Sequence, residues 1–273
     1  MAPYRDEHGH KGFFQAISRA SAHVVQRVTV VIPGWPITRP LRIAFLSDLH
    51  AGSHADDATR LTAIVAEAAS FAPHLVLHGG DFMNMQLIGG GRLSPRKIAK
   101  IIAPLKAPLG CFAVLGDHDQ DYGSDEIIAA LAAEGVATLN DEKRNLIFEG
   151  KEIDLIGLPG AHRIRDAART LLATLSPATP TIVLTHDPYR FAHVPSGPHI
   201  TLAGHTHGGQ IRFPRIGAIY NASRAPLRWT YGLVKEGDKS LYVSGGLGTS
   251  GIPLRIGIPP EYAILELRGP AAR

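Results

Sequence analysis

The sequence predicts a layered α/β fold. One observation is a series of short apolar runs bounded by Gly, Pro, Asp or His, which is typical of buried central strands. A second is that helical patterns separate these runs, so that strands and helices alternate along the chain. The chain has 273 residues, 45% of them hydrophobic, which is enough for one large core. We therefore expect a single main domain.

The expected strands and helices follow from these patterns. Strands are predicted at Leu41 to Leu46, Leu75 to Leu77, Cys111 to Leu115, Ile153 to Ile156, Thr181 to Leu184 and Ile200 to Ala203. Helices are predicted at Asp57 to Ser70, Ser94 to Ala103, Ser124 to Ala133 and Ile164 to Leu175. Ser94 and Ser124 offer N-cap hydroxyls.

The region after residue 205 loses helical periodicity and becomes rich in Gly and Pro. Strand-like segments at Leu241 to Ser244 and Ala263 to Leu267 predict that this half completes a sheet of mixed strand direction. We expect the main domain to span residues 41–268, followed by a loose tail at 269–273.

Residues 1–40 form an expected N-terminal extension. Phe13, Ile17, Ala20 and Val24 fall on one helical face, which suits either a helix docked on the core or an amphipathic contact with a membrane surface. The segment from His23 to Ile32 then alternates as a strand does.

Composition bounds the function only loosely. The formal net charge of +4 suits an anionic substrate or surface and does not imply a nucleic-acid partner. The single cysteine, Cys111, lies in an apolar run and is expected in the core of a protein from a reducing compartment. The sequence has neither a run of about 20 apolar residues nor a secretory signal, so a cytoplasmic location is expected, with peripheral contact to the inner membrane face left open.

Groups that can bind metal follow five expected strands. They are Asp48 and His50, Asp81, the Gly116-Asp117-His118-Asp119 motif, His186, and the Gly204-His205-Thr206-His207-Gly208-Gly209 motif. The first, second and fourth are weak evidence alone, whereas two carboxylates within the third motif would repel each other without a cation nearby. Two histidines flanked by glycines at a strand end make good paired ligands. Because ligands in α/β sheets bind at the carboxyl ends of strands, we expect all five to meet in one cleft.

This ordered set resembles the calcineurin-like metallophosphoesterase superfamily. The motifs cover about residues 41–210, and Gly208-Gly209-Gln210 and Pro260-Glu261 are similar to a bacterial branch of membrane-associated and UDP-2,3-diacylglucosamine pyrophosphatase-like members. The resemblance implies a four-layer αββα fold, in which helices flank a β-sandwich of two mixed sheets. It also implies two divalent metal ions that share a hydroxide for in-line attack on phosphorus.

The resemblance also implies a role for each matched residue. Asp48, His50 and His207 would hold one ion, Asp117, His186 and His205 the other, and Asp81 would bridge them. His118 would act as general acid or stabilise the transition state, or else only orient a neighbour. The nitrogen and oxygen ligands suit Mn, Fe, Zn, Co or Ni.

Position 117 departs from the family pattern, which has asparagine there. An aspartate oxygen can occupy the place of the amide oxygen with little change in geometry. Its negative charge is expected to bind the second ion more tightly and to lower the Lewis acidity of that ion.

Two segments are candidates for substrate recognition. The segment from Met83 to Gly91 could be an apolar lip or an ordinary turn over the core. Arg212, Arg215, Arg224 and Arg228 could clamp phosphate or face anionic lipid, although some of them are expected to be solvated surface charges.

The expected function is hydrolysis of a phosphodiester or phosphoanhydride in a small-molecule substrate, either lipid-linked or nucleotide-linked. The alternatives are a phosphomonoesterase and a non-catalytic metal-binding scaffold; the scaffold is disfavoured because every ligand position is retained. A nuclease is disfavoured because no basic stripe interleaved with aromatic residues is present.

Overall fold

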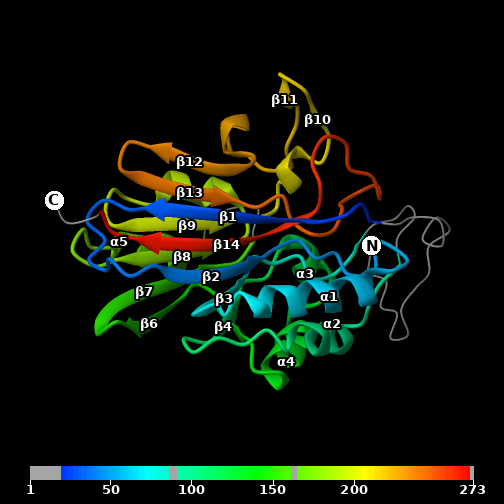
Figure 1. Cartoon of the computed structure of the whole chain (residues 1–273), viewed down its shortest axis with the longest axis horizontal. Helices are drawn as coiled ribbons and strands as arrows, with labels where there is room; N and C mark the ends of the chain where they lie inside the picture. The colour runs from blue at the N-terminus through cyan, green and yellow to red at the C-terminus, as the bar shows by residue number, and fades with distance from the viewer. Residues whose placement is uncertain (1–19, 86–90, 161–164, 271–273) are drawn as a thin grey trace.

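The computed structural model describes residues 20–85, 91–160 and 165–270 (Figure 1). Two six-stranded sheets, one with the order β1-β14-β2-β3-β4-β5 and the other β12-β13-β9-β8-β7-β6, form the centre of the molecule. Both contain parallel and antiparallel pairs, which confirms the expected mixed sheets.

The first sheet is built from strands distributed along the whole chain. Its strands are β1 (Val24–Val31), β2 (Leu41–Leu46), β3 (Leu75–His78), β4 (Cys111–Ala113), β5 (Ala137–Thr138) and β14 (Glu261–Arg268). β1 pairs in parallel with β14 along its full length. The strand expected before residue 41 is therefore one of the two edge strands of the first sheet.

The second sheet comes mainly from the C-terminal half. Its strands are β6 (Glu142–Phe148), β7 (Lys151–Leu158), β8 (Thr181–Thr185), β9 (His199–Ala203), β12 (Gly232–Glu236) and β13 (Lys239–Val243). A separate two-stranded hairpin, β10 (Arg212–Phe213) and β11 (Gly217–Ala218), projects from the body (Figure 1).

Helices cover the outer faces of the two sheets. The α-helices are α1 (Asp57–Ser70), α2 (Pro95–Ile102), α3 (Asp117–Tyr122), α4 (Ser124–Ala133) and α5 (Asp166–Ala173), and the 3₁₀ turns are η1 (Pro188–His193), η2 (His207–Gly209) and η3 (Leu227–Trp229). The core residues of α1, α2 and α4 pack on the first sheet. Those of α5 pack on β7 and β8. The result is the expected four-layer αββα arrangement.

Strand β2 shows why this sequence forms the inner layers. Ile43 and Phe45 pack between the two sheets. Ala44 and Leu46 face the helices. Because successive side chains of a strand point to opposite faces, the part of a strand that is covered on both sides is apolar at consecutive positions, as from Ile43 to Leu46. The uninterrupted apolar runs of the sequence follow from this double burial.

Several local predictions need correction. Ser94 caps α2 as expected, accepting a hydrogen bond from the Lys97 N–H, but Ser124 is the first residue of α4, whose N-cap is Gly123. Strand β4 ends at Ala113, so residues 114–115 continue as a loop. Cys111 is only partly buried, and its thiol donates to the Leu105 carbonyl at 3.2 Å.

The expected flanking segments are described only in part. The N-terminal helix prediction falls mostly on residues 1–19, which lie outside the described residues, as do 86–90 of the expected apolar lip. Met83, the first residue of that lip, is completely buried in the core. At the other end, Gly269 is buried and its N–H donates to the Ile37 carbonyl, so the first tail residue is part of the packed structure. No helix in the described ranges is long and apolar enough to cross a bilayer.

His78, the last residue of β3, makes the stability of the fold dependent on pH. It is buried, neither ring nitrogen has a hydrogen-bond partner, and burial lowers its pKa to about 4. The ordinary value is 6.5, so on acidification the unfolded chain takes up the proton first. The stabilising contribution of the neutral His78 side chain is therefore fully present above pH 6.5, and this contribution is lost as the pH falls toward 4.

The corresponding prediction concerns the His78→Phe variant. Between pH 7.5 and pH 5, the metal-free wild type should lose about 2 kcal/mol of unfolding free energy more than the variant, because the variant cannot take up this proton. Urea unfolding at the two pH values measures the difference. Equal losses in the two proteins would show that His78 does not contribute.

Candidate metal centre

The groups expected to bind metal lie together at one edge of the sandwich. Asp48 and His50 follow β2, Asp81 follows β3, and Asp117 and His118 begin α3 just after β4. From the second sheet, His186 follows β8, and His205 and His207 follow β9. These strands are parallel within each sheet, so that their carboxyl ends reach the same edge. The structure brings all eight side chains together.

The first group consists of Asp48, His50 and His207, all of them buried. The Nε2 atoms of His50 and His207 face each other at 3.1 Å. Asp48 Oδ1 lies 3.8 Å from His207 Nε2. Two imidazole nitrogens and a carboxylate directed at one point form a donor set that suits a divalent transition metal.

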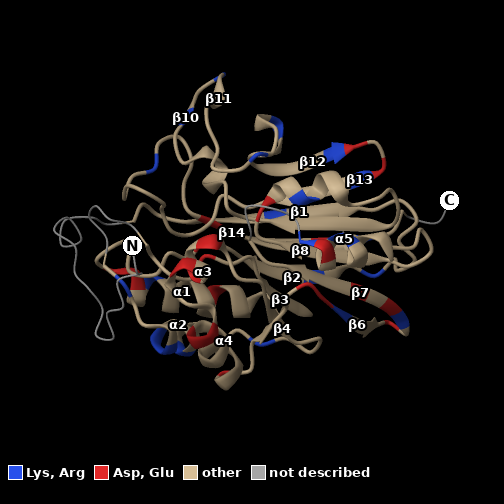
Figure 2. Cartoon of the chain, turned by 180° about the vertical axis from the view of Figure 1, so that it is seen from behind, with Lys and Arg blue, Asp and Glu red and all other residues tan. Residues whose placement is uncertain are grey.

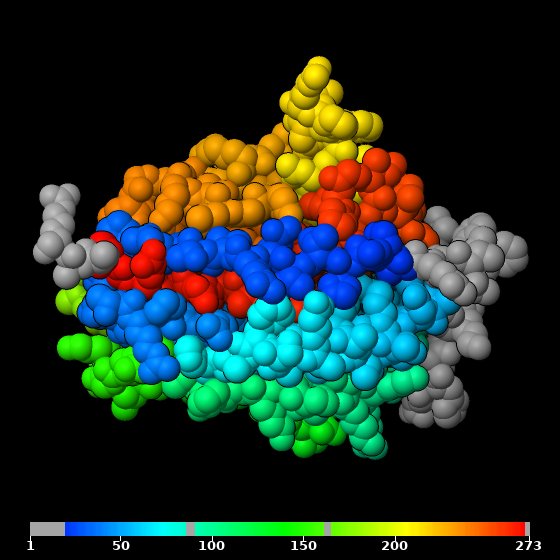
Figure 3. Space-filling model, in the orientation of Figure 1, coloured from blue at the N-terminus to red at the C-terminus, as the bar shows by residue number. Residues whose placement is uncertain are grey.

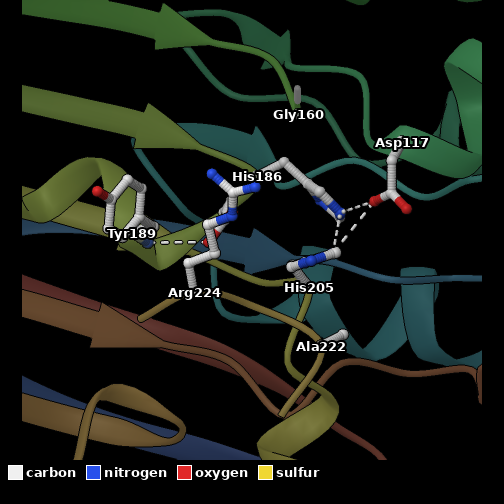
Figure 4. A pocket seen from close by; sticks show the side chains of 8 residues that line it. Asp117, Gly160, His186, Tyr189, His205, Ala222 and Arg224 are labelled. Carbon is white, nitrogen blue, oxygen red and sulfur yellow. Dashed lines mark hydrogen bonds and ion pairs between the residues drawn. The ribbon is translucent and has the colours of Figure 1, made fainter. Parts of the chain in front are cut away.

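The second group consists of Asp117, His186 and His205 (Figure 4), together with Asp81, which the figure does not draw. Asp117 Oδ1 lies 3.1 Å from both His186 Nε2 and His205 Nδ1. Those two nitrogens are 3.0 Å apart. The arrangement again directs nitrogen and oxygen donors at one point.

Asp81 connects the two groups. Its Oδ2 atom is 3.3 Å from His186 Nε2 in the second group and 3.5 Å from His50 Nε2 in the first. Its Oδ1 atom accepts a hydrogen bond from the His118 backbone N–H at 3.1 Å. The buried carboxylate therefore lies between the groups and also fixes the start of α3.

The side chain of His118 lies at the rim of the first group. Its ring is 5.1 Å from that of His50, edge to face, and its Nε2 atom is 3.4 Å from Ser250 Oγ. With His50 and Asp81 it forms a third set of donors close enough for a metal. It is less buried than His50.

The backbone around these residues is strained. Asp48, His50, Asp81, His205 and His207 all have positive φ angles, between 37° and 69°. Non-glycine residues rarely adopt this conformation, which costs on the order of 1–3 kcal/mol each and persists only where the surroundings enforce it. Such strain is concentrated at functional sites.

Two glycines allow the loops to approach this closely. A Cβ atom at position 116 would collide with the carboxylate of Asp81, and one at 204 would collide with the side chains of Ser47 and Asp48. The glycines next to the acidic and histidine motifs are therefore required by close packing around the carboxylates.

The protonation states differ between the two groups. Burial lowers the pKa of His50 and of His207 well below the ordinary value, so both rings are neutral with a lone pair free to bind a cation. Burial opposes protonation of His186 as well, but Asp81 and Asp117 raise its pKa well above the ordinary value. Hydrogen bonds from His186 and His205 overcome burial and lower the pKa of Asp117. A cation at the second group would replace these protons, so the donors present fit divalent metal at both groups.

Hydrogen bonds from neighbouring groups orient the donors. Ser47 Oγ donates to Asp48 Oδ2 at 2.6 Å, and the His205 N–H donates to Asp48 Oδ1 at 2.9 Å.

Asp119 accepts from the backbone N–H groups of Met83 and Gly116, both at 3.0 Å. Burial and the neighbouring Asp81 raise the pKa of Asp119 to about 7. Through its two hydrogen bonds, Asp119 connects the loop after β3 with the loop after β4.

A pocket of about 190 Å³ opens beside the second group (Figure 4). Asp117, His186 and His205 line its inner side, and Tyr189, Ala222 and Arg224 line its outer part. Asp187 fixes Tyr189 by capping η1, since its carboxylate accepts from the Tyr189 N–H at 2.9 Å. Arg224 is exposed at this rim, where it can meet an anionic ligand.

Two of the other predicted substrate arginines contact protein groups instead, and Arg215 is exposed outside the residues that line this pocket. Arg228 pairs with Glu236 at 2.7 Å and lies over the Trp229 ring. Arg212 donates to the Gly208 carbonyl and lies over the Tyr231 ring. The geometry favours Arg224 among these candidates.

Arg255 contacts the centre although no sequence pattern predicts it. Its guanidinium lies 3.3 Å from His207 Nδ1 and donates to the carbonyls of Gly245 and Gly248. It therefore ties the 245–248 loop to the second histidine of the Gly204–Gly209 motif. No sequence pattern predicts such a contact for an arginine in a loop that is rich in Gly and Pro.

Comparison with known proteins finds a matching family and related sequences. The sequence model of the calcineurin-like phosphoesterase family matches residues 41–209. The uncharacterized protein YpbG of Bacillus subtilis is 31% identical, over 85% of this chain and 82% of its own length. Phosphodiesterase YaeI of Escherichia coli is 28% identical, over 84% of this chain and 82% of its own length.

A solved structure shares the fold. The NAD nucleotidase NadN of Haemophilus influenzae superposes with a TM-score of 0.51 at 13% identity. The match covers 76% of this chain but only 45% of the nucleotidase. At this identity the likeness concerns the fold alone.

Proposed function

Because the chain belongs to the calcineurin-like phosphoesterase family, and so is a metal-dependent hydrolase of phosphate esters, we propose that it holds two divalent ions and cleaves phosphodiester or phosphoanhydride bonds. The observation that carries this proposal is the position of Asp81 within reach of both donor groups. A carboxylate that can serve two ions is what a two-metal phosphoesterase needs.

Each residue has a proposed role in this centre. Asp48, His50 and His207 hold the first ion, Asp117, His186 and His205 hold the second, and Asp81 reaches both. When bound, the pair of ions supplies Lewis acidity to the phosphoryl oxygens and lowers the pKa of water. His118, at the rim of the first group, donates a proton to the leaving oxygen.

Two observations favour a diester or anhydride over a monoester. The pocket beyond Asp117 offers room for a substituent on the phosphate, with Tyr189 to contact it and Arg224 to meet its charge. The related YaeI is named a phosphodiesterase. A lipid-linked or nucleotide-linked substrate, as in the bacterial branch that the motifs resemble, remains part of the proposal.

The test is a substrate panel with manganese, cobalt, nickel, iron and zinc in turn. A chromogenic phosphodiester and a nucleotide-linked pyrophosphate should be hydrolysed with a kcat/KM at least about tenfold above that of the matching monoester. Preference for the monoester would identify a phosphomonoesterase. No hydrolysis with any ion, in protein that binds the ion, would identify a metal-binding scaffold.

Arg224→Ala tests the pocket. The variant should raise KM for an anionic diester about fivefold to tenfold with a smaller effect on kcat, because an exposed guanidinium contributes a charge-assisted hydrogen bond to the bound substrate. Arg228→Ala is the matched control, since Arg228 already pairs with Glu236, and it should leave KM unchanged. If only Arg228→Ala raised KM, substrate binding would depend on Arg228, and its assignment to Arg224 would be wrong.

Asp117→Asn tests the departure at position 117. Removing the charge should weaken metal binding at the second group by at least about tenfold, while kcat at saturating metal stays equal or rises, because the second ion becomes a stronger Lewis acid. Manganese titration and turnover at several metal concentrations measure both effects. Loss of turnover even at saturating metal would show that the charge itself is essential.

A further inference from the structure

An exposed apolar surface begins on the β10–β11 hairpin, which projects from the body (Figure 3). Ile216, Ile219 and Tyr220 are exposed by 72%, 62% and 70%, and Phe213 is also exposed. Side chains of this size and exposure on one short projection are unusual in a protein surface that meets only water.

A second loop extends this surface. Ile252, Leu254 and Ile256 are exposed on residues 250–257. Ile256 forms a β-bridge with Ile211, and its carbonyl accepts from the Arg212 N–H at 2.8 Å. We call the exposed apolar residues of the hairpin segment 213–220 and of the loop 252–256 the apolar rim. Among the described residues, more than half of the exposed large apolar side chains belong to it.

The two chain segments that carry the apolar rim contain charge of one sign. The sequence contains no Asp or Glu from residue 188 to 235 or from 239 to 260. Arg215 is exposed at the turn of the hairpin, and Figure 2 shows basic but no acidic residues on the projecting hairpin. Apolar side chains beside arginines, on segments that contain no acidic residue, complement an apolar phase with an anionic surface.

We propose that the apolar rim docks into the interfacial region of an anionic lipid bilayer. The exposed isoleucines would enter the boundary between headgroups and acyl chains, Tyr220 would lie at the headgroup level, and Arg215 would meet lipid phosphate. A second copy of the chain fits less well, because a symmetric contact would bring the arginines of both hairpins together.

Docking would bring the candidate metal centre close to the bilayer surface. The Gln210 side chain bonds to both the N–H and the carbonyl of Ser250, linking the bases of the hairpin and the loop. Ser250 Oγ is itself 3.4 Å from His118 Nε2. The apolar rim and the centre are therefore parts of one connected structure.

Vesicle co-sedimentation tests the proposal without any substrate. The full-length protein should bind vesicles of phosphatidylcholine with 30 mol% phosphatidylglycerol more tightly than pure phosphatidylcholine vesicles. The triple variant Ile216→Ser, Ile219→Ser, Tyr220→Ser should bind at least about tenfold more weakly. Arg215→Asn, in which asparagine tolerates the positive φ of 68° at this position, should bind anionic vesicles about fivefold more weakly.

The matched control is Ile147→Ser, which removes an exposed isoleucine from β6, at the opposite end of the second sheet from β12. It should bind as the wild type does. Equal binding by the triple variant and the wild type, or no binding by either, would overturn the proposal. Wild-type dimers that the triple variant abolishes, without vesicle binding, would overturn it in favour of a second copy.

A tryptophan probe gives a second measurement that does not depend on weakened binding. In the variant Ile216→Trp, fluorescence should shift to shorter wavelength when anionic vesicles are added, because the indole leaves water. The same probe in Ile147→Trp should not shift. An unchanged spectrum for Ile216→Trp in the presence of vesicles would contradict insertion of the hairpin.

Discussion

Asp81→Asn is expected to lower kcat by at least about a thousandfold and to reduce the bound metal. The Asp81 carboxylate is buried and lies within 3.5 Å of a histidine nitrogen in each donor group. Asparagine keeps the size and the acceptor for the His118 N–H but places a neutral amide between the two groups. Losing this charge removes several kcal/mol of stabilisation, which corresponds to a rate effect of this size.

Metal content and turnover of the purified variant measure this effect. Asp154→Asn is the matched control, because Asp154 is paired with Lys143 on β7 and β6, away from the centre. It should retain both metal and activity. An Asp81→Asn protein with wild-type metal content and turnover would refute the role of Asp81.

His118→Gln is expected to lower kcat by about a hundredfold to ten-thousandfold while the metal content stays unchanged. The effect should depend on the leaving group. An alkoxide needs a proton from the protein, whereas a nitrophenolate leaves without one, so the loss should be larger for an alkyl ester than for a nitrophenyl ester. His23→Gln, which changes a histidine paired with Glu67, is the control and should be fully active.

The leaving-group series separates the possible roles of His118. A loss of equal size for all leaving groups, with metal retained, would mean that His118 orients its neighbours or contacts the phosphate without donating a proton. A parallel loss of metal would assign it to the third donor set, with His50 and Asp81.

The sequence predicts the layers and the meeting of the site residues for a specific physical reason. Parallel strands such as β2 and β3 are covered on both faces, so their central residues are apolar, and their carboxyl ends lie at one edge. A polar residue within a few positions of the end of such a strand is therefore placed by the fold itself. Asp48 and Asp81 were predictable on this ground.

Other features could not be predicted because their sequences lack a regular pattern. Strand β6 begins Glu-Lys-Arg-Asn and is an edge strand with exposed polar side chains, so it has no apolar run. The contact of Arg255 with His207 depends on loop geometry, and so does the difference between Arg224 and the paired Arg228. The roles of these arginines depend on their positions in the folded chain, which short-range sequence patterns do not encode.

The most direct test of the two-ion proposal is anomalous diffraction from crystals soaked in manganese. Two peaks are expected, one enclosed by Asp48, His50 and His207 and the other by Asp117, His186 and His205, with a carboxylate oxygen of Asp81 in contact with both. A single peak, or peaks that Asp81 does not touch, in crystals of protein that is active with manganese would contradict the account.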